Sequence, residues 1–332
     1  MKKHIMILLI TLIIALSVGA SEMPCNSADG LVIQYASVDV EDSAVGIGML
    51  AFKKYVEDAS GGAIKVDLYF NGQLGGDRQS AESILLGTLD MSVVDVGIMG
   101  AYNGAFFIVS MPYTFPTKQS CYNALDGELG EALLEKANEA GFHIWGWVDA
   151  GTRHIANSVK QINTISDLKG LKMRVPESSI TVDFMKAFGT NPTPISFSET
   201  YTALQQHVVD GMENPIELLY TSKFMEVMNY LTLTAHTETA MPHITSSTFE
   251  QKLTDEQRKI IRGGAKAQQD ANRKAIAESE AVYQQEMLKQ GKIITELSDE
   301  RKQEFVEAVK PVYEKYRTII GENILEIAAK IK

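Results

Sequence analysis

The sequence predicts an α/β protein of two lobes, each a mostly parallel sheet flanked by helices, with a long helix bracing both. Strand-like stretches with apolar residues at every second position alternate with helix-like stretches along most of the chain. At 332 residues, the chain exceeds what one compact core usually holds. A proline-free stretch from Thr254 to about Gly291 is rich in Ala, Gln, Glu and Lys and predicts the bracing helix.

The first elements follow from local patterns. "LVIQYAS" predicts a strand, and Asp42 and Ser43 offer an N-cap to a helix with four apolar residues on one face: Val45, Met49, Phe52 and Val56. Gly61-Gly62 ends this helix. "AIKVDLYF" then alternates with period two, which predicts a half-buried strand. A helix near 78–87 and a strand at 89–96 follow.

The alternation continues through the middle of the chain. A helix is expected around 127–140, and "FHIWGWVDAGTRHIANS" predicts one or two strands. The remaining elements, in order, are a strand at "LKMRVP", a helix at 178–188, an extended "PTPIS", a helix at 198–209 capped by Ser198, and "GMENP". At ~1.5 Å per residue, one helix over 254–291 would approach 50 Å, more than one small lobe's width. Two helices broken at Gly263-Gly264 are an alternative.

No Pro/Gly-rich linker divides the chain, so several strands or helices should cross between the lobes. We expect one lobe to comprise residues 27–150 and 240–279, and the other residues 151–239 and 280–332.

The first twenty residues have the pattern of a secretory signal peptide. Lys2 and Lys3 precede a short apolar run, and small residues end at Ala20, after which cleavage is expected. This predicts a periplasmic protein, with a membrane anchor as the alternative. No later stretch has about 18 consecutive apolar residues, so the mature chain should be soluble.

Charge and cysteine content narrow the function classes. The net charge is −11, and it becomes about −13 once the two lysines of the signal are removed. An acidic chain without a basic stripe argues against nucleic-acid and anionic-lipid partners. Cys25 and Cys121 could form a disulfide in an oxidising compartment, and Cys25 could instead be lipidated; the sequence leaves both open.

Catalytic signatures are absent from the sequence. There is no HExxH, GxSxG, P-loop or complete GxGxxG motif, and the histidines are scattered without i, i+4 pairing. We therefore expect no metal and no cofactor, and a binding protein rather than an enzyme.

Two arginines and their neighbours predict a binding site. Arg153 in "GTRHIANS" and Arg174 in "LKMRVP" fall in neighbouring strands, and Pro176 ends the second strand just after its arginine. Ligands of open α/β sheets bind at the carboxyl ends of strands. A guanidinium cannot be deprotonated, so an inward Arg174 must find an anion, either Asp167 or Glu177 of the chain or a ligand.

Several long stretches resemble one family. "YFNGQLGGDRQSAESILLGTLDMSVV", "GTRHIANS", "DLKGLKMRVPES" and "PTPISFSETYTALQQHVVDGMENP" occur in the order seen in the solute-binding proteins of tripartite ATP-independent periplasmic (TRAP) transporters, the DctP family. The resemblance covers nearly the whole mature chain. It implies a monomeric two-lobed receptor that closes around a small organic acid and delivers it to a membrane permease.

The resemblance also implies roles for individual residues. Arg174 matches the family's carboxylate clamp, in which a guanidinium fork makes two charge-assisted hydrogen bonds. Arg153 matches a second arginine near the ligand, Asn214 an asparagine that hydrogen-bonds it, and Phe197 an aromatic residue beside it. Phe197 could also be core, and Asn214 a turn residue before Pro215.

On the other lobe the match is looser. Asp77 could face the ligand or cap the helix that follows it, and Asp95 ends a strand where some sugar-acid binders of the family carry a glutamate. Carboxylates opposite an arginine repel a second carboxylate on the ligand and accept hydrogen bonds from hydroxyls. This favours a uronate or aldonate. Tyr35 and Ser37, at the end of the first strand, are expected to line the cleft from topology alone.

Alternatives remain open at this point: a receptor for a C4-dicarboxylate or keto acid, a secreted enzyme on a binding-protein scaffold, and a sensor that signals through a partner protein.

Overall fold

The chain forms a single mixed sheet covered by helices on both faces. The structure is a computed structural model that describes residues 30–331. The predicted signal peptide, residues 1–20, and Cys25 lie outside this range, whereas Cys121 is buried. The strands are β1 (Leu31–Ala36), β2 (Ile64–Tyr69), β3 (Met91–Val93), β4 (Phe142–Asn157), β5 (Lys172–Val175), β6 (Asn191–Pro194), β7 (Gly211–Pro215), β8 (Tyr230–Ser246) and β9 (Ile293–Glu296).

The helices follow the predicted alternation in the first two thirds of the chain. The α-helices are α1 (Ala44–Ala59), α2 (Asp77–Leu86), α3 (Val96–Met99), α4 (Phe107–Ser110), α5 (Lys118–Leu125), α6 (Glu128–Glu139), α7 (Ser179–Ala187), α8 (Phe197–Gln205), α9 (Ile216–Thr221), α10 (Ser247–Lys252), α11 (Asp255–Lys289), α12 (Asp299–Ile320) and α13 (Glu322–Ala328). No helix within the described residues is long and apolar enough to cross a membrane.

The strand order is β2-β1-β3-β8-β4-β7-β5-β6, with β9 beside β8. Pairing is parallel at both ends of the sheet, where β1 pairs with β2 and β3, and β5 pairs with β6 and β7. The expected parallel sheets are therefore present as the two ends of one continuous sheet. We call them the β1–β3 group and the β5–β7 group.

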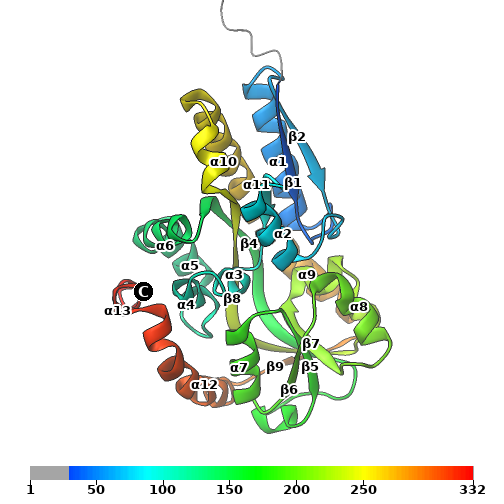
Figure 1. Ribbon diagram of the computed structural model, residues 1–332. Coiled ribbons are helices and arrows are strands. Elements are labelled where there is room, and N and C mark those ends of the chain that lie inside the picture. Colours follow the sequence, from blue (N-terminus) through cyan, green and yellow to red (C-terminus); the bar gives the residue numbers. More distant parts are fainter. Residues whose placement is uncertain (1–29, 332) are drawn as a thin grey trace, which may run out of the picture. The chain divides into compact units, whose positions relative to one another are not determined.

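Two long antiparallel strands join these groups. β4 and β8 pair over most of their length; the end of β8 pairs with β3, and the end of β4 pairs with β7 (Figure 1). The stretch over residues 142–157 is thus one strand, with bulges, rather than two. β8 was not among the predicted elements.

The bracing helix is continuous. α11 spans 35 residues, and its N-cap Thr254 forms a capping box with Gln257. The alternative of two helices broken at Gly263-Gly264 is wrong, because both glycines lie inside α11 against α1. A Cβ on Gly264 would lie 2.6 Å from a methyl carbon of Val56, so the glycine permits this close approach.

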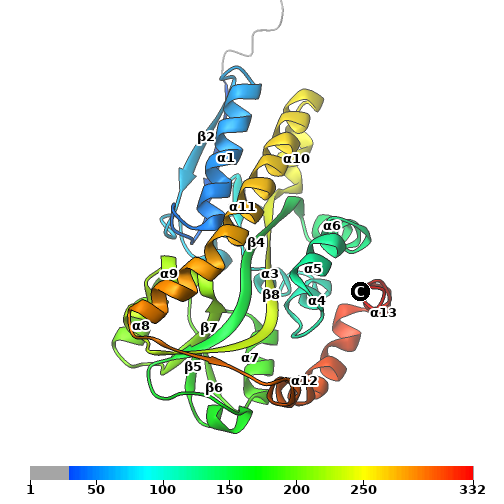
Figure 2. The same ribbon diagram turned by 180° about the vertical axis from the view of Figure 1, so that it is seen from behind.

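The same helix reaches the other group. Tyr283 of α11 stacks on Tyr220 of α9, with ring centres 4.4 Å apart. Figure 2 shows α11 running from beside α1 to α9. α12 and α13 also bridge: Phe305 of α12 packs on Phe188 after α7, whereas Lys330 after α13 pairs with Glu128 of α6.

Local capping agrees with the prediction at α1 and differs at α8. The Ser43 hydroxyl accepts a hydrogen bond from the Gly46 N–H, and the four predicted apolar residues of α1 are buried. α8 begins at Phe197, so its N-cap position is Ser196 rather than Ser198.

Candidate functional site

Arg174 is buried and has no acidic partner in direct contact. It lies on β5, whose carboxyl end meets those of the parallel strands β6 and β7, and it is 2 % exposed. Its Nε donates to the Ile195 carbonyl oxygen at 2.9 Å. Among residues 30–331, no carboxylate oxygen lies within 4.0 Å of its guanidinium nitrogens.

The two protein partners considered for Arg174 are engaged elsewhere. Asp167 accepts hydrogen bonds from the Asn163 and Thr164 N–H groups. Glu177 pairs with Arg78 of α2, with 3.3 Å between Nε and Oε1. Both alternatives are therefore wrong, and the charge of Arg174 is left for another acid.

Burial lowers the pKa of Arg174 to about 10, an effect opposed by Glu213 and increased by Arg153. The guanidinium therefore remains charged at neutral pH. A buried charge is costly unless it is paired and hydrogen-bonded. Within the described residues, only one of its nitrogens, Nε, makes a hydrogen bond to the protein.

Arg153 differs because its fork is held by the protein. It lies on β4 beside β7, where its Nε and Nη2 both donate to the Glu213 carboxylate, Nη2 at 2.7 Å from Oε1. His236 Nε2 lies 3.3 Å from Glu213 Oε2. Burial alone would raise the pKa of Glu213, but Arg153 and His236 lower it to about 2. Arg153 is thus neutralised, and its Nη1 faces Asp95 Oδ2 at 3.8 Å.

Three carboxylates of the β1–β3 group surround this region. Asp77 is the first residue of α2, whose N-cap is Gly76, so the alternative that Asp77 caps the helix is wrong. Asp95 caps α3 by accepting from the Gly97 N–H at 2.8 Å. Burial raises the pKa of Asp77 well above its usual value, the charges of Asp95 and Asp39 raise it further, and Arg174 opposes this. These groups therefore share one electrostatic environment.

Unpaired buried polar atoms gather at the same place. Four of them lack a hydrogen-bond partner in the described structure: Asn214 Nδ2, Ser178 Oγ, Asp77 Oδ1 and Asp39 Oδ1. Buried polar groups are nearly always hydrogen-bonded in native proteins. Donors from the β5–β7 group and acceptors from the β1–β3 group thus both have unused bonding capacity.

Phe197 lies beside Arg174, and Asn214 lies on the neighbouring strand β7. Asn214 lies within β7 opposite His154 and is 2 % exposed, so the alternative of a turn residue is wrong. The ring centre of Phe197 lies 5.8 Å from the Arg174 guanidinium carbon. Phe197 also packs edge-on against Phe224, so it belongs both to the core and to the site.

The prediction for Tyr35 requires correction. Its ring packs at 5.2 Å from that of Phe52, and its hydroxyl donates to Gln268 of α11. The side chain is fully buried inside the β1–β3 group rather than facing the site. Ser37 lies two residues further along the chain, just past the end of β1. Its hydroxyl donates to Asp39 Oδ2 at 2.7 Å and thereby holds Asp39.

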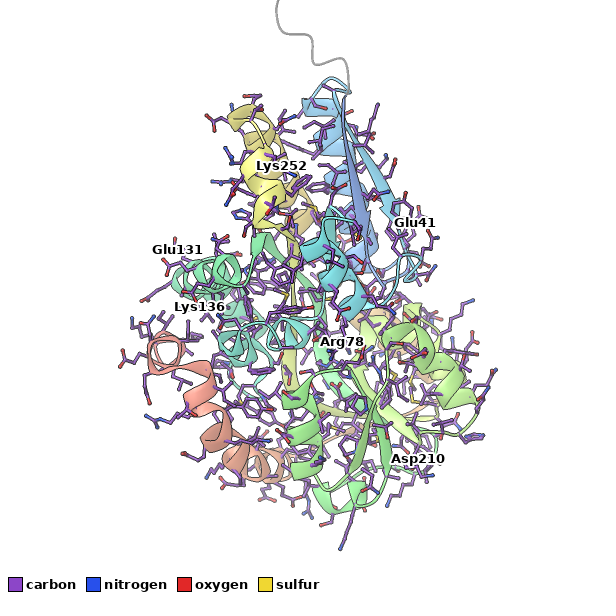
Figure 3. All side chains as sticks on the ribbon, in the orientation of Figure 1. Glu41, Arg78, Glu131, Lys136, Asp210 and Lys252 are labelled. Carbon is purple, nitrogen blue, oxygen red and sulfur yellow. The ribbon has the colours of Figure 1, made fainter. Side chains whose placement is uncertain are left out.

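The two groups touch around the site and enclose it. Arg78 of α2, labelled in Figure 3, meets Glu177 of the β5–β7 group. A Cβ on Gly97 would lie 2.6 Å from Ser178 Oγ, which places α3 against the start of α7. A hollow lined by Asp95, Arg153 and Pro176 has a volume of only about 20 Å³. This holds about one water molecule.

Sequence reasoning missed Asp39, Ser178 and Glu213. Glu213 directly precedes Asn214 in "GMENP", and an acid beside a predicted site asparagine was a usable signal. Asp39 lies in "VDVED", among other acids, and nothing in the sequence singles it out. Within residues 30–331, no cluster of His, Cys, Asp and Glu is arranged to hold a metal ion.

Comparison with known proteins identifies relatives over most of the chain. Residues 35–318 match the family described as bacterial extracellular solute-binding protein, family 7. A solute-binding protein of Verminephrobacter eiseniae strain EF01-2 is 32% identical over 286 residues, covering 86% of this chain and 85% of the relative.

Solved structures agree in fold. The sugar acid binding protein DctPAm of Advenella mimigardefordensis strain DPN7T, in complex with galactonate, gives a TM-score of 0.87 at 29% identity and covers 91% of this chain and 98% of its own. A TRAP periplasmic solute binding protein of Sulfitobacter sp. NAS-14.1 with bound β-D-galacturonate gives 0.85 at 33% identity, covering 90% and 99%. A third, from Sulfurospirillum deleyianum DSM 6946 with bound succinate, gives 0.86 at 29%, covering 91% and 99%.

Proposed function

Because the chain belongs to family 7 of the bacterial extracellular solute-binding proteins, the TRAP solute receptors that bind small organic acids, we propose that its own ligand is a polyhydroxylated monocarboxylate, a sugar acid. The observation that carries this proposal is the contrast between the two buried arginines. Arg153 is neutralised by Glu213, whereas Arg174 has no carboxylate in contact among the described residues. One unmatched cation fits one carboxylate.

The groups around Arg174 support a ligand that also carries hydroxyls. Asn214 Nδ2 and Ser178 Oγ can donate to the ligand, and Asp77, Asp39 and Asp95 can accept from its hydroxyls. A second carboxylate would face the carboxylate of Asp95 and be repelled. The relatives with galactonate and galacturonate support the sugar-acid proposal, and the relative with succinate supports a C4-dicarboxylate as the alternative.

The receptor would work by closure. A ligand held by Arg174 and Asn214 on one side and by Asp77 and Asp95 on the other shifts the open–closed equilibrium towards the closed form. The proposed lobes are residues 27–150 with 240–279, and 151–239 with 280–332. We further propose that the protein is a periplasmic monomer that neither turns its ligand over nor binds nucleic acid. It would hand the ligand to the membrane permease of a TRAP transporter.

The test is a thermal-shift screen of aldonates, uronates, dicarboxylates and keto acids, followed by calorimetry. A bound ligand raises apparent stability by mass action. Arg174→Lys removes the planar fork and should weaken binding at least tenfold, since charge-assisted hydrogen bonds are worth about 1.5–3 kcal/mol each. Arg301→Lys, at an exposed pair with Glu304, is the matched control and should bind as the wild type.

Three outcomes would count against the proposal. Unchanged affinity of Arg174→Lys would remove this residue from the site. Tighter binding of succinate than of every sugar acid would favour the dicarboxylate alternative. Conversion of a bound acid into a new compound, detected by mass spectrometry, would indicate an enzyme.

A further inference from the structure

The small hollow beside Arg153 is polar and lies next to the proposed carboxylate site. It has a volume of about 20 Å³, and its lining includes Ser110, Thr181, Thr237 and Asp95. Pro176 also lines it, two residues after Arg174. The hollow therefore lies beside the end of the strand that carries Arg174.

One hydroxyl at this hollow is unsatisfied. Thr237 is 8 % exposed, and its Oγ1 has no hydrogen-bond partner within the described residues. The next residue, Glu238, also borders the hollow. Its carboxylate accepts from the Thr152 hydroxyl at 2.9 Å. Thr237, unlike Glu238, thus presents an unused hydroxyl to the hollow.

The charges at the hollow disfavour an anion. The Arg153 fork is occupied by Glu213, and the remaining Nη1 lies 3.8 Å from Asp95 Oδ2 and 3.5 Å from Thr239 Oγ1. Two carboxylates therefore surround one guanidinium. A neutral alcohol can donate to Asp95 and exchange a hydrogen bond with Thr237, whereas a carboxylate would be repelled.

We propose that this hollow is an end pocket that accepts a terminal hydroxymethyl group of the ligand and so selects acyclic aldonates over uronates and over acids with carboxylates at both ends. The inference rests on the proposed function, because it requires the other end of the ligand to be bound at Arg174. The volume fits one small polar group. A pyranose ring, as in a uronate, has no room to enter it.

The experiment compares sugar acids by calorimetry on the full chain: two of them differ from D-galactonate only at C6, and one is a cyclic uronate. D-Galactonate is compared with its 6-deoxy analogue, D-fuconate, with galactarate and with D-galacturonate. We expect galactonate to bind most tightly and fuconate about 3- to 30-fold more weakly, because the loss leaves buried polar groups unpaired. Thr237→Val, which conserves shape, should weaken galactonate by a similar factor and leave fuconate unchanged.

Thr318→Val, at an exposed residue of α12, is the control and should preserve the galactonate-to-fuconate ratio. Asp95→Asn should improve galactarate relative to galactonate. Equal binding of galactonate and fuconate, tighter binding of galacturonate, or a Thr237→Val loss that is equal for all ligands would overturn the end pocket. These results leave the proposed function standing as long as binding depends on Arg174. If none of the acids binds, the proposed function and the end pocket both fail.

Discussion

The carboxyl group of Glu217 should make the protein less stable as pH rises. Glu217 lies in the first turn of α9 and is 2 % exposed; its Oε1 accepts from the Ala44 N–H at the start of α1. Its Oε2 is buried without a partner in the described structure. Burial raises the pKa of Glu217 to about 8, the Ala44 N–H opposes this, and Asp39 adds to it.

The sign follows from proton uptake. Between the ordinary pKa of 4.5 and about 8, the folded state holds a proton that the unfolded state has lost. The free energy of unfolding therefore falls as pH rises through this window and levels off above it. Each unit of pKa shift is worth about 1.4 kcal/mol, which sets an upper bound of about 5 kcal/mol. Because water penetration and relaxation reduce such penalties, we expect about 2 kcal/mol.

Glu217→Gln isolates this contribution. Glutamine keeps an oxygen that can accept from the Ala44 N–H and removes the charge. Urea unfolding of wild type and variant at pH 4.5 and 8.5 should give similar free energies at the lower pH and a variant more stable by about 2 kcal/mol at the higher pH. Glu41→Gln, at an exposed residue labelled in Figure 3, should follow the wild type. A wild-type-minus-variant difference that does not change with pH would refute the reasoning.

Three further predictions concern packing, the buried ion pair and the contact between the two groups. Gly264→Ala should lower the free energy of unfolding by about 1–3 kcal/mol, because its Cβ would meet Val56 at 2.6 Å. Gly263→Ala should be neutral or stabilising, because only the partly exposed Tyr55 ring must move, so equal losses would contradict the packing argument. Glu213→Gln should lower the free energy of unfolding by about 3–5 kcal/mol, measured by calorimetry, because it leaves the buried guanidinium of Arg153 without a countercharge. An unchanged melting temperature would contradict this. Arg78→Ala should speed ligand release at most about fivefold in stopped flow, because the pair is partly exposed, and a larger change would show that Arg78 does more than pair with Glu177.

The elements that the sequence predicts well are those whose signals are local. α1 has a serine cap and one apolar face, and α11 has a capping box and no helix breaker except Gly263-Gly264. The sequence does not show whether Gly263-Gly264 breaks the helix, because the contact that requires glycine there is not local. It depends on the approach of α1, more than 200 residues earlier in the chain, and the side chains of Tyr55 and Val56 fill the space above the two glycines.

β8 was missed because its pattern depends on its neighbours. "YLTLTAHTETAMPHITS" carries threonines and histidines where a predicted core strand would be apolar. In the fold, β8 lies in the middle of the sheet between β3 and β4, so most of its residues are buried whatever their polarity. Its polar side chains then pair within the protein, as Thr234 does with His236 at 2.8 Å.

The predictions for the site divide in the same way, between residues with a signal in the sequence and residues whose position depends on the fold. Arg174, Asn214 and Phe197 follow from motifs of the family, and the structure places Phe197 beside Arg174 and Asn214 on the neighbouring strand. The face to which a side chain points at the end of a strand depends on register, which the sequence alone does not fix, so Tyr35 was placed on the wrong side. Asp39, four residues later, lies in the loop that turns towards the site and was overlooked.

The contrast between the two arginines explains how binding and closure can be coupled. If Arg174 were paired with an acid of the chain, as Arg153 is with Glu213, a ligand would have to displace that acid. If Arg174 were exposed, its pair with a carboxylate would be worth only about 0–1 kcal/mol. An enclosed guanidinium without an acidic partner needs no displacement of a protein acid and is not weakened by solvent. Desolvation destabilises the empty closed form, and a bound carboxylate removes that penalty. Under the proposed function, closure is favoured only when an acid is present, and the raised pKa values of Asp77 and Asp39 lessen the competition from the chain's own carboxylates.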